Sequence, residues 1–408
     1  MQVRSTLYHS LQFLCLGVIS VTIALCQNPA LSLATKPAPP VAYVYVSKQP
    51  TDTSPNQVLG YSVSSNGKLT PIVGSPFQAD VSLMAVNGKY LFGGKSFALN
   101  GTGNDGHIDT YKIAANGVLG YVVSNQTSVV DEGYYYRLFL DHTGAHLYGE
   151  MGYETGAALG SLDIDKQTGT LALTQGLDLG RWGLADITVS ANNKYLYVVE
   201  QDFGGNWVAT VPLGSDGAPL AVSSWRRSPD YPVAKPTLYY SPVAITADPS
   251  NHVAVAMQVL SGPDQGAGAN VPAQLGVYTA DAKGNLTTTS TYKNMPTLPL
   301  FGYDGPTSMK LSPSGKLLAI SGWQGLQVFH FNGANPITPY ATLVKNSSFT
   351  VGPLKQLGWD NHDHLFAAFA NKLYVFTVTP TSITQAPGSP YSIPGNPGAQ
   401  YLIVQPLL

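Results

Sequence analysis

The chain has 408 residues, a formal net charge of −2 at pH 7 and only 11% charged residues. Its longest basic run is Arg226-Arg227, which argues against nucleic acids and acidic membrane surfaces as partners. Gly, Pro and Tyr are abundant, with 42, 30 and 24 copies. A chain with long helices would normally contain more Glu, Lys, Arg and Ala than this one. The composition therefore predicts short strands joined by turns, in a chain too long for one ordinary core.

The first residues have the pattern of a targeting segment. Arg4 precedes an apolar stretch, Leu11 to Leu25, and Ser32-Leu33-Ala34 offers small residues at the −3 and −1 positions of a cleavage site. The apolar stretch is short for a membrane span, so a cleaved signal peptide over residues 1–34 is favoured over a retained anchor. We therefore expect a secreted or periplasmic protein. Both cysteines lie in this segment, so the mature chain would have no disulfide.

Residues 35–40 form a Pro-rich linker, and a repeated pattern of strands comes after it. An apolar strand ends in a tight turn and leads into a second strand, then a third, then a Gly-containing turn into a fourth. We label these strands a (innermost) to d (outermost). Seven b strands are predicted, at Ala42–Val46, Tyr90–Gly93, His146–Gly149, Tyr195–Val199, Val253–Met257, Leu317–Ser321 and Leu365–Phe369. Four short strands per repeat are typical of the blades of a β-propeller.

The a strands number seven only if Tyr401–Val404, near the C-terminus, is one of them. The chain thus opens on a b strand and ends on an a strand. We predict an all-β, seven-bladed propeller of four-stranded antiparallel blades over residues 41–408. Its C-terminal strand would complete the blade that the N-terminal strand begins, which removes a free sheet edge. A duplicated phrase, Gly74-Ser75-Pro76-Phe77 and Gly388-Ser389-Pro390-Tyr391, supports the repeat.

The predicted connections differ in length. The a–b and c–d turns are short and rich in Asn, Asp and Gly, as tight hairpins require. The long connections are b–c or d–a segments, at 96–107, 127–136, 225–240, 261–272 and 292–306. In antiparallel blades these two kinds of connection leave by the same face. That face is the predicted binding face.

Acidic and aromatic residues are predicted at the mouth of the central channel on this face. The candidate binding residues are Asp131, Tyr135, Glu150, Trp182, Glu200, Tyr240, Asp304 and Trp323. Such a mouth would suit a neutral sugar, a peptide or a metal ion, although strand-ending residues also line propeller mouths simply by packing blade on blade. Glu150 and Glu200 end consecutive b strands, so paired carboxylates could do acid–base chemistry or bind Ca²⁺. Solvated or hydrogen-bonded carboxylates are the favoured interpretation.

No cofactor is predicted. His362-Asp363-His364 resembles a metal-binding pair but falls in an a–b turn on the opposite face, where a plain hairpin is expected. Asp163 to Gly169 imitates a calcium loop without its acidic twelfth position, which is Thr174, and is expected to be a c–d turn.

Several phrases resemble the lactonase-type seven-bladed propellers, the family of 6-phosphogluconolactonase and the muconate-lactonizing propellers. They are Lys194-Tyr195-Leu196-Tyr197-Val198-Val199, Ser312-Pro313-Ser314-Gly315-Lys316 and Asn66-Gly67-Lys68-Leu69-Thr70-Pro71 with the Gly-Ser-Pro-Phe phrase. The resemblance covers residues 41–408 and implies the fold and, in catalytic members, lactone chemistry.

Four positions depart from the catalytic pattern of that family. Ala185 and Asp186 stand where catalytic members have Arg and His, and Met309 and Trp323 stand where they have Glu and Arg. Lactone opening needs a donor or cation for the carbonyl oxygen and a general base. We therefore predict a monomeric binding or scaffold propeller for a glycan, peptide or protein ligand, without lactonase activity. The alternative is a hydrolase of sugar or aryl lactones with a rearranged site; a quinone-holding redox propeller has only its Trp-containing blades in its favour.

Overall fold

The computed structural model describes residues 38–48, 57–94, 106–127, 134–153, 156–180, 183–201, 207–228, 239–261, 272–291, 293–298, 306–322, 325–340, 344–345, 356–369, 371–394 and 399–407. By its internal contacts the chain divides into two units, Met1–Pro39 and Pro40–Leu408. Every described strand belongs to the second unit.

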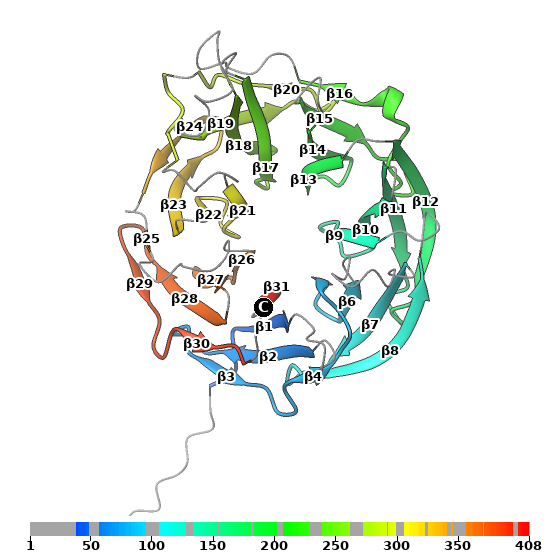
Figure 1. Ribbon diagram of the computed structural model, residues 1–408, viewed down its shortest axis with the longest axis vertical. Coiled ribbons are helices and arrows are strands. Elements are labelled where there is room, and N and C mark those ends of the chain that lie inside the picture. The colour runs from blue at the N-terminus through cyan, green and yellow to red at the C-terminus, as the bar shows by residue number, and fades with distance from the viewer. Residues whose placement is uncertain are drawn as a thin grey trace, which may run out of the picture. The chain divides into compact units, whose positions relative to one another are not determined.

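The described residues of this unit form seven antiparallel sheets, the blades, arranged in a ring (Figure 1). The innermost strands of blades 1 to 7 are β31 (Ala399–Pro406), β5 (Leu83–Val86), β9 (Tyr134–Leu140), β13 (Gly183–Val189), β17 (Tyr239–Ala247), β21 (Pro306–Leu311) and β26 (Gln356–Trp359). The second strands are β1 (Ala42–Lys48), β6 (Tyr90–Gly94), β10 (His146–Tyr153), β14 (Tyr195–Gln201), β18 (His252–Ser261), β22 (Leu317–Gly322) and β27 (His364–Phe369).

The third and outer strands complete each blade. The third strands are β2 (Gln57–Val63), β7 (His107–Ile113), β11 (Gly156–Ile164), β15 (Trp207–Pro212), β19 (Gln274–Ala280), β23 (Gly325–Asn332) and β28 (Lys372–Val378). The outer strands are β3 (Leu69–Pro71), β8 (Leu119–Gln126), β12 (Leu171–Gly180), β16 (Arg226–Arg227), β20 (Leu286–Thr287), β24 (Asn335–Pro339) and β29 (Ile383–Gln385). Three short strands, β4 (Phe77–Gln78), β25 (Val344–Lys345) and β30 (Tyr391–Ser392), also pair with third strands, and η1 (Val222–Ser224) is a single 3-10 turn.

The ring closes as the sequence predicts. β31 pairs antiparallel with β1, with Ala42 opposite Pro406 and Val44 opposite Val404. The last strand of the chain is therefore the innermost strand of blade 1, whose other strands come from the N-terminal end (Figure 1). The fold class and the way the ring closes are both confirmed.

The second strands are apolar because they have no solvent face. Each lies between two strands of its own blade and packs on both neighbouring blades, as in β22 and β27, where every residue is buried. Seven clusters of buried apolar side chains result, one at each blade boundary. This explains why the predicted b strands agree with the observed ones to within a few residues.

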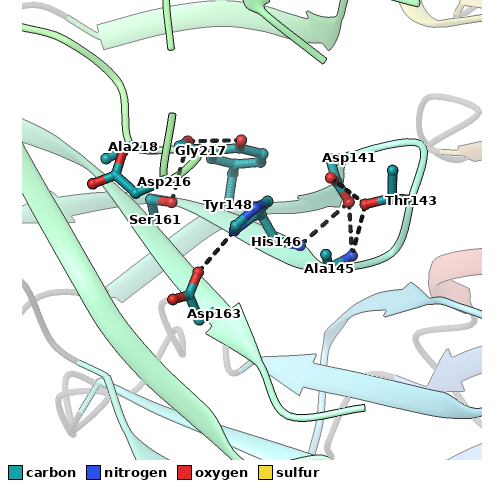
Figure 2. Close-up of polar contacts among 10 residues, drawn as sticks. All are labelled: Asp141, Thr143, Ala145, His146, Tyr148, Ser161, Asp163, Asp216, Gly217 and Ala218. Carbon is teal, nitrogen blue, oxygen red and sulfur yellow. Dashed lines mark hydrogen bonds and ion pairs between the residues drawn. The ribbon is translucent and has the colours of Figure 1, made fainter. Parts of the chain in front are cut away.

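Hydroxyl groups tie neighbouring blades together near the c–d turns. Tyr45 of blade 1 donates to the Gly117 carbonyl of blade 2 at 2.8 Å, and Thr210 of blade 4 donates to that of Gly284 in blade 5 at 2.7 Å. Figure 2 shows the same arrangement between blades 3 and 4, where the Tyr148 hydroxyl donates to the Gly217 carbonyl at 2.9 Å. These glycines have positive φ, 80° at Gly117, 79° at Gly284 and 74° at Gly217. A small residue in a left-handed turn thus lets one blade approach the next.

The duplicated phrase forms the same local structure twice. Ser75-Pro76 and Ser389-Pro390 are both cis peptide bonds. The Ser75 hydroxyl accepts a hydrogen bond from the Gly60 amide and the Ser389 hydroxyl one from the Val375 amide, each at 2.9 Å. Blades 1 and 7 therefore share this way of finishing the sheet.

Candidate functional site

Two ion pairs occupy the boundary between blades 3 and 4, and one of them lies beside the channel. Arg137 and Glu150 are cross-strand neighbours on β9 and β10. Arg137 Nη1 donates to Glu150 Oε2 at 2.6 Å and to the Leu184 carbonyl of blade 4 at 2.8 Å, and Nη2 donates to the Ala185 carbonyl. Glu150 Oε1 accepts from the Leu184 amide at 3.0 Å. Both members of the pair are thus hydrogen-bonded to the backbone at the start of β13.

Asp186 extends this cluster to a third blade. Its Oδ1 lies 3.8 Å from Arg137 Nε, and its Oδ2 accepts from the Ile245 amide of blade 5 at 3.0 Å. The Arg137 and Asp186 side chains are 32% and 26% exposed, although both belong to innermost strands. They are therefore partly exposed on the inner side of the ring.

The cluster carries one buried carboxylate, Glu150, together with a carboxylate and a guanidinium that are partly exposed. Burial raises the pKa of Glu150, and the charge of Arg137 and the Leu184 amide oppose that shift. Burial lowers the pKa of Arg137, but Glu150 and Asp186 outweigh it, so its pKa is raised. Tyr401 of blade 1 interacts with both charges: burial and Asp186 raise the pKa of its phenol to about 12 against the pull of Arg137. Arg137 is thus a fixed cation.

The second ion pair lies farther out on blade 4. Glu200, on β14, is 4% exposed, and its Oε2 accepts from Arg227 Nη2 on β16 at 3.1 Å. The Arg227 guanidinium lies over the Trp207 ring, 5.5 Å from the ring centre. Its side chain is 49% exposed. A buried carboxylate is therefore neutralised by a cation that a flat aromatic ring holds in place.

A pocket opens beside this second pair. It encloses about 40 Å³ and is lined by Leu179, Leu184, Glu200, Val222, Trp225 and Arg227. Leu179 ends blade 3, Leu184 begins blade 4, and the strand ends they occupy face the predicted binding side. The Trp225 indole donates to the Leu220 carbonyl at 3.2 Å, which fixes its ring as one wall. The pocket combines an apolar, aromatic wall with one carboxylate and one guanidinium.

The structure brings two of the eight predicted binding residues to this boundary. Leu184 lies between Glu150 and Glu200. Its amide donates a hydrogen bond to Glu150, and it is the cross-strand partner of Glu200. Neither is a solvated carboxylate, since both are buried and ion-paired. Tyr135, 1% exposed, lies between blades 2 and 3 with its hydroxyl 2.5 Å from that of Thr127; burial raises its pKa to about 12.

The other predicted binding residues fall partly or wholly outside the described part of the chain. Tyr240 lies on β17, with its side chain outside the described residues. Asp131, Trp182, Asp304 and Trp323 lie wholly outside them. Their binding roles stay predictions.

Sequence reasoning missed the three residues that give the site its chemistry: Arg137, Trp225 and Arg227. Arg137 has a detectable signal, because it interrupts an aromatic and apolar strand, Tyr134 to Leu140, that should otherwise be buried. Arg227 is visible in the sequence only as half of a short basic run. Nothing in the sequence shows that it folds back onto Glu200.

The two metal-like motifs have structural roles. The His362–His364 turn is a hairpin, as predicted, with Asp363 at a φ of 58°. His364 is 2% exposed, however, and its Nδ1 lies 2.6 Å from Asp360 Oδ2, so it belongs to the core. Asp163–Gly169 joins β11 to β12, also as predicted. Within the described ranges no group of three His, Cys, Asp or Glu side chains could hold a metal ion.

The comparisons with known proteins show the fold. No family model matches the sequence, and no curated protein matches it. Among solved structures, the periplasmic gluconolactonase of Pseudomonas aeruginosa is similar with a TM-score of 0.62 and 16% identity, over 89% of this chain and 99% of that one. A candidate 6-phosphogluconolactonase of Bacteroides uniformis is similar with a TM-score of 0.60 and 14% identity, over 89% and 99%.

A third similar structure is a protein of unknown function from Desulfotomaculum acetoxidans, with a TM-score of 0.57 and 13% identity, over 85% of this chain and 95% of that one. At such identities the shared feature is the seven-bladed ring. In the part of the chain that is described, no helix has the length and apolarity needed to cross a bilayer.

Proposed function

We propose that the chain is a lactonase-type propeller that binds a small molecule in the pocket between blades 3 and 4. The observation that carries the proposal is the Glu200–Arg227 pair: a buried carboxylate and a half-exposed guanidinium meet at the edge of a pocket whose other walls are apolar. Small-molecule sites combine a largely apolar lining with a few fixed polar groups in this way.

The size of the pocket favours a small ligand over a macromolecule. Its volume of about 40 Å³ is well below the roughly 300–1,000 Å³ of ordinary small-molecule sites, so it admits only a small group. A protein partner would need an interface of about 800 Å² on this chain. A larger ligand would place only one small group in the pocket.

The test is a fragment screen observed by ligand NMR, with two matched variants. Val222 lines the pocket and is 42% exposed, whereas Val73 is 84% exposed and is not a pocket residue. Val222→Lys places bulk and charge in the pocket and should weaken the binding of hits at least about 10-fold, a change of roughly 1.4 kcal/mol. Val73→Lys should leave binding unchanged. A screen without hits, or hits equally sensitive to both variants, would refute the proposal.

Lactone hydrolysis in the channel is the second candidate, favoured by the position of Asp186. This carboxylate stands where catalytic lactonase-type propellers have His, and it lies 3.8 Å from the guanidinium of Arg137. Asp186 could act as general base and Arg137 as the cation for the carbonyl oxygen. Two similar structures, a gluconolactonase and a candidate 6-phosphogluconolactonase, are named for the same chemistry.

The hydrogen bonds of Arg137 favour the binding function over hydrolysis. Its N–H groups already donate to Glu150 and to two backbone carbonyls, and are therefore engaged before any substrate carbonyl arrives. We expect no turnover of gluconolactone or aryl lactones above background. Turnover that survives purification and falls at least about 100-fold in Asp186→Asn would instead support the hydrolase.

We further propose that the protein is exported and monomeric. The n-region, apolar stretch and small-residue cleavage site of residues 1–34 support export. Sequencing the N-terminus of the protein from the cell exterior or periplasm should give Thr35, and light scattering should give the mass of one chain. An intact Met1 in the cytoplasm would contradict the first claim.

A further inference from the structure

We infer that residues 221–225 form a gate over the pocket between blades 3 and 4, and that a ligand larger than one small group enters by displacing the Trp225 ring. The inference rests on the proposed function and names how that same site is opened. It depends on three observations: the small size of the pocket, the fixed position of its walls on the strands, and the local bonding of the wall that carries Trp225.

The pocket is too small for a whole ligand while its walls stay where they are. Its volume of about 40 Å³ is room for about three water molecules, at roughly 10–15 Å³ for each. Sites for whole small molecules are larger, at roughly 300–1,000 Å³. Entry of a larger ligand therefore requires one wall to move.

The walls on the strands are held in place by the sheets. Leu179 and Leu184 are 4% and 6% exposed and belong to β12 and β13. The Leu184 amide also donates to Glu150 at 3.0 Å. Arg227 lies on β16, which pairs with β15, and its guanidinium donates to Glu200. Moving any of these three walls would disrupt a blade.

The wall that carries Val222 and Trp225 is hydrogen-bonded within itself. In the part of the chain that is described, every hydrogen bond of residues 221–225 ends within residues 220–225. The Trp225 amide donates to the Val222 carbonyl at 3.1 Å, and the Trp225 indole donates to the Leu220 carbonyl at 3.2 Å. η1 has no buried residue, and the segment packs on the core between the blades through the Trp225 ring. The indole bond therefore holds the ring to its own segment and not to a strand.

The two ends of the segment are its firm attachments. At one end the Leu220 amide donates to the Pro212 carbonyl of β15 at 2.9 Å. At the other end Arg226 and Arg227 pair with β15. A short segment with few buried contacts and exposed hydrogen bonds opens locally at low free energy. Rotation about the two ends carries the Trp225 ring off the core and enlarges the pocket.

The gate also sets the affinity of the site. A ligand that binds only the open form shifts the population towards that form. Its apparent affinity is reduced by the fraction of molecules that are open, so any change that favours opening strengthens binding.

The first test measures the hydrogen exchange of two indole N–H groups by NMR in the unaltered protein. Trp359 is the matched control, because its indole also donates to a backbone carbonyl at 3.2 Å, that of Lys310, but its side chain is buried in the core. We expect the Trp225 indole to exchange at least about 100-fold faster than that of Trp359.

Variants at the first hinge separate a gate from a ring that is merely exposed. Ala221 has a φ of −51°, which proline also adopts, and its amide donates no hydrogen bond in the described structure. Ala221→Pro restricts the open segment and should slow exchange at Trp225 by about 2–5-fold, and Ala221→Gly should speed it by a similar factor. Neither variant should change exchange at Trp359, and melting curves confirm that the ring of blades is intact.

The second test titrates indole, a flat uncharged group that matches the displaced side chain, with the Leu184 amide signal as the local reporter. Trp225→Ala removes the ring that indole must displace, so we expect this variant to bind indole at least about 10-fold more tightly than the unaltered protein. With Trp225 in place, Ala221→Pro should weaken indole binding and Ala221→Gly should strengthen it, each by about 2–5-fold. In the Trp225→Ala background neither hinge variant should matter, because the gate has lost its ring.

The outcomes separate the two claims. The gate is refuted if exchange at Trp225 is as slow as at Trp359, if both Ala221 variants leave exchange and indole binding unchanged, or if indole binds Trp225→Ala but not the unaltered protein. The proposed function stands in these cases as long as library fragments respond to Val222→Lys. If no fragment responds to Val222→Lys, the proposed function itself fails, whatever the exchange rates are.

Discussion

At the scale of single residues, Arg137 joins two blades. Its guanidinium holds Glu150 of its own blade and the backbone carbonyls of Leu184 and Ala185 in the next blade. Leu184 is also a wall of the candidate pocket. The pair thus sets the position of one side of the pocket, without touching a ligand.

Removing the carboxylate of this pair should destabilise the protein. A broken buried ion pair costs about 3–5 kcal/mol, and the one-third exposure of Arg137 reduces the expected cost of Glu150→Ala to about 2–3 kcal/mol. Glu150→Gln keeps an acceptor for the Leu184 amide and should cost less. The free energy of unfolding in denaturant measures both. Equal stability of Glu150→Ala and the unaltered protein would contradict the assigned role.

At the scale of elements, the c–d turns join each blade to its neighbour. Gly217 shows clearly why glycine is needed in such a turn. Its φ is 74°, and a Cβ there would lie 2.8 Å from the His146 ring (Figure 2). His146 is itself held by Asp163 at 2.8 Å (Figure 2). The space for a larger residue is therefore closed from the blade 3 side.

Gly217→Ala should therefore cost about 2–4 kcal/mol, from backbone strain and overlap together. Gly120 in β8 is the matched control, since its added Cβ would meet nothing within 4 Å and its φ is not positive. Gly120→Ala should leave the free energy of unfolding nearly unchanged. Similar costs for both variants would show that the turn imposes no steric limit.

Two of these turns should also contribute to acid sensitivity. Hydrogen bonds from the amides of Gln167 and Thr168 lower the pKa of Asp165 below 3.8, and the Asn285 side chain and amide lower that of Asp281. A lowered folded-state pKa stabilises the fold above the unfolded value, and this stabilisation is lost as pH falls through the folded one. Asp165→Asn, Asp281→Asn should therefore reduce stability near neutral pH and flatten its decline below about pH 4, measured by denaturant titration at several pH values. An unchanged acid limb would contradict this.

Sequence and structure agree best where the pattern is local. Apart from β1, the second strands come directly after tight turns and begin with a mostly apolar run, so residues such as Val253–Met257 could be placed from the chain alone. The candidate site depends on contacts between blades, and these have no local signature. Arg227 is 27 residues from Glu200, and the Arg137 carbonyl partners are 47 and 48 residues away. The sequence predicts a plain hairpin at His364 because nothing in the turn indicates its burial against Asp360.

At the scale of the whole molecule, stability depends on one closing strand. β31 supplies the inner edge of blade 1 and contributes Leu402 and Val404 to the core between blades 7 and 1. Gln405 adds a bond at 2.7 Å from the Gly88 amide of blade 2. Three blades therefore meet on the last residues of the chain.

Deleting residues 399–408 should abolish cooperative unfolding or cause aggregation, because blade 1 would keep an open inner edge. Removal of residues 1–37, which lie before β1, is the control and should preserve the melting temperature. Circular dichroism melts and light scattering measure both. A melting temperature within a few degrees of the full chain after the C-terminal deletion would show that β31 does not hold the ring.

The pairing of β31 with β1 also sets an order of events during synthesis. Blades 2 to 7 are each built from consecutive strands, so each can form once its own segment has left the ribosome. Blade 1 cannot, because its strands β1 and β2 emerge first and its inner strand emerges last. At translation rates of about 5–20 residues per second, the inner edge of β1 stays unpaired for roughly 20–70 seconds. During that time the nascent chain keeps an unpaired strand edge that other chains or chaperones can bind.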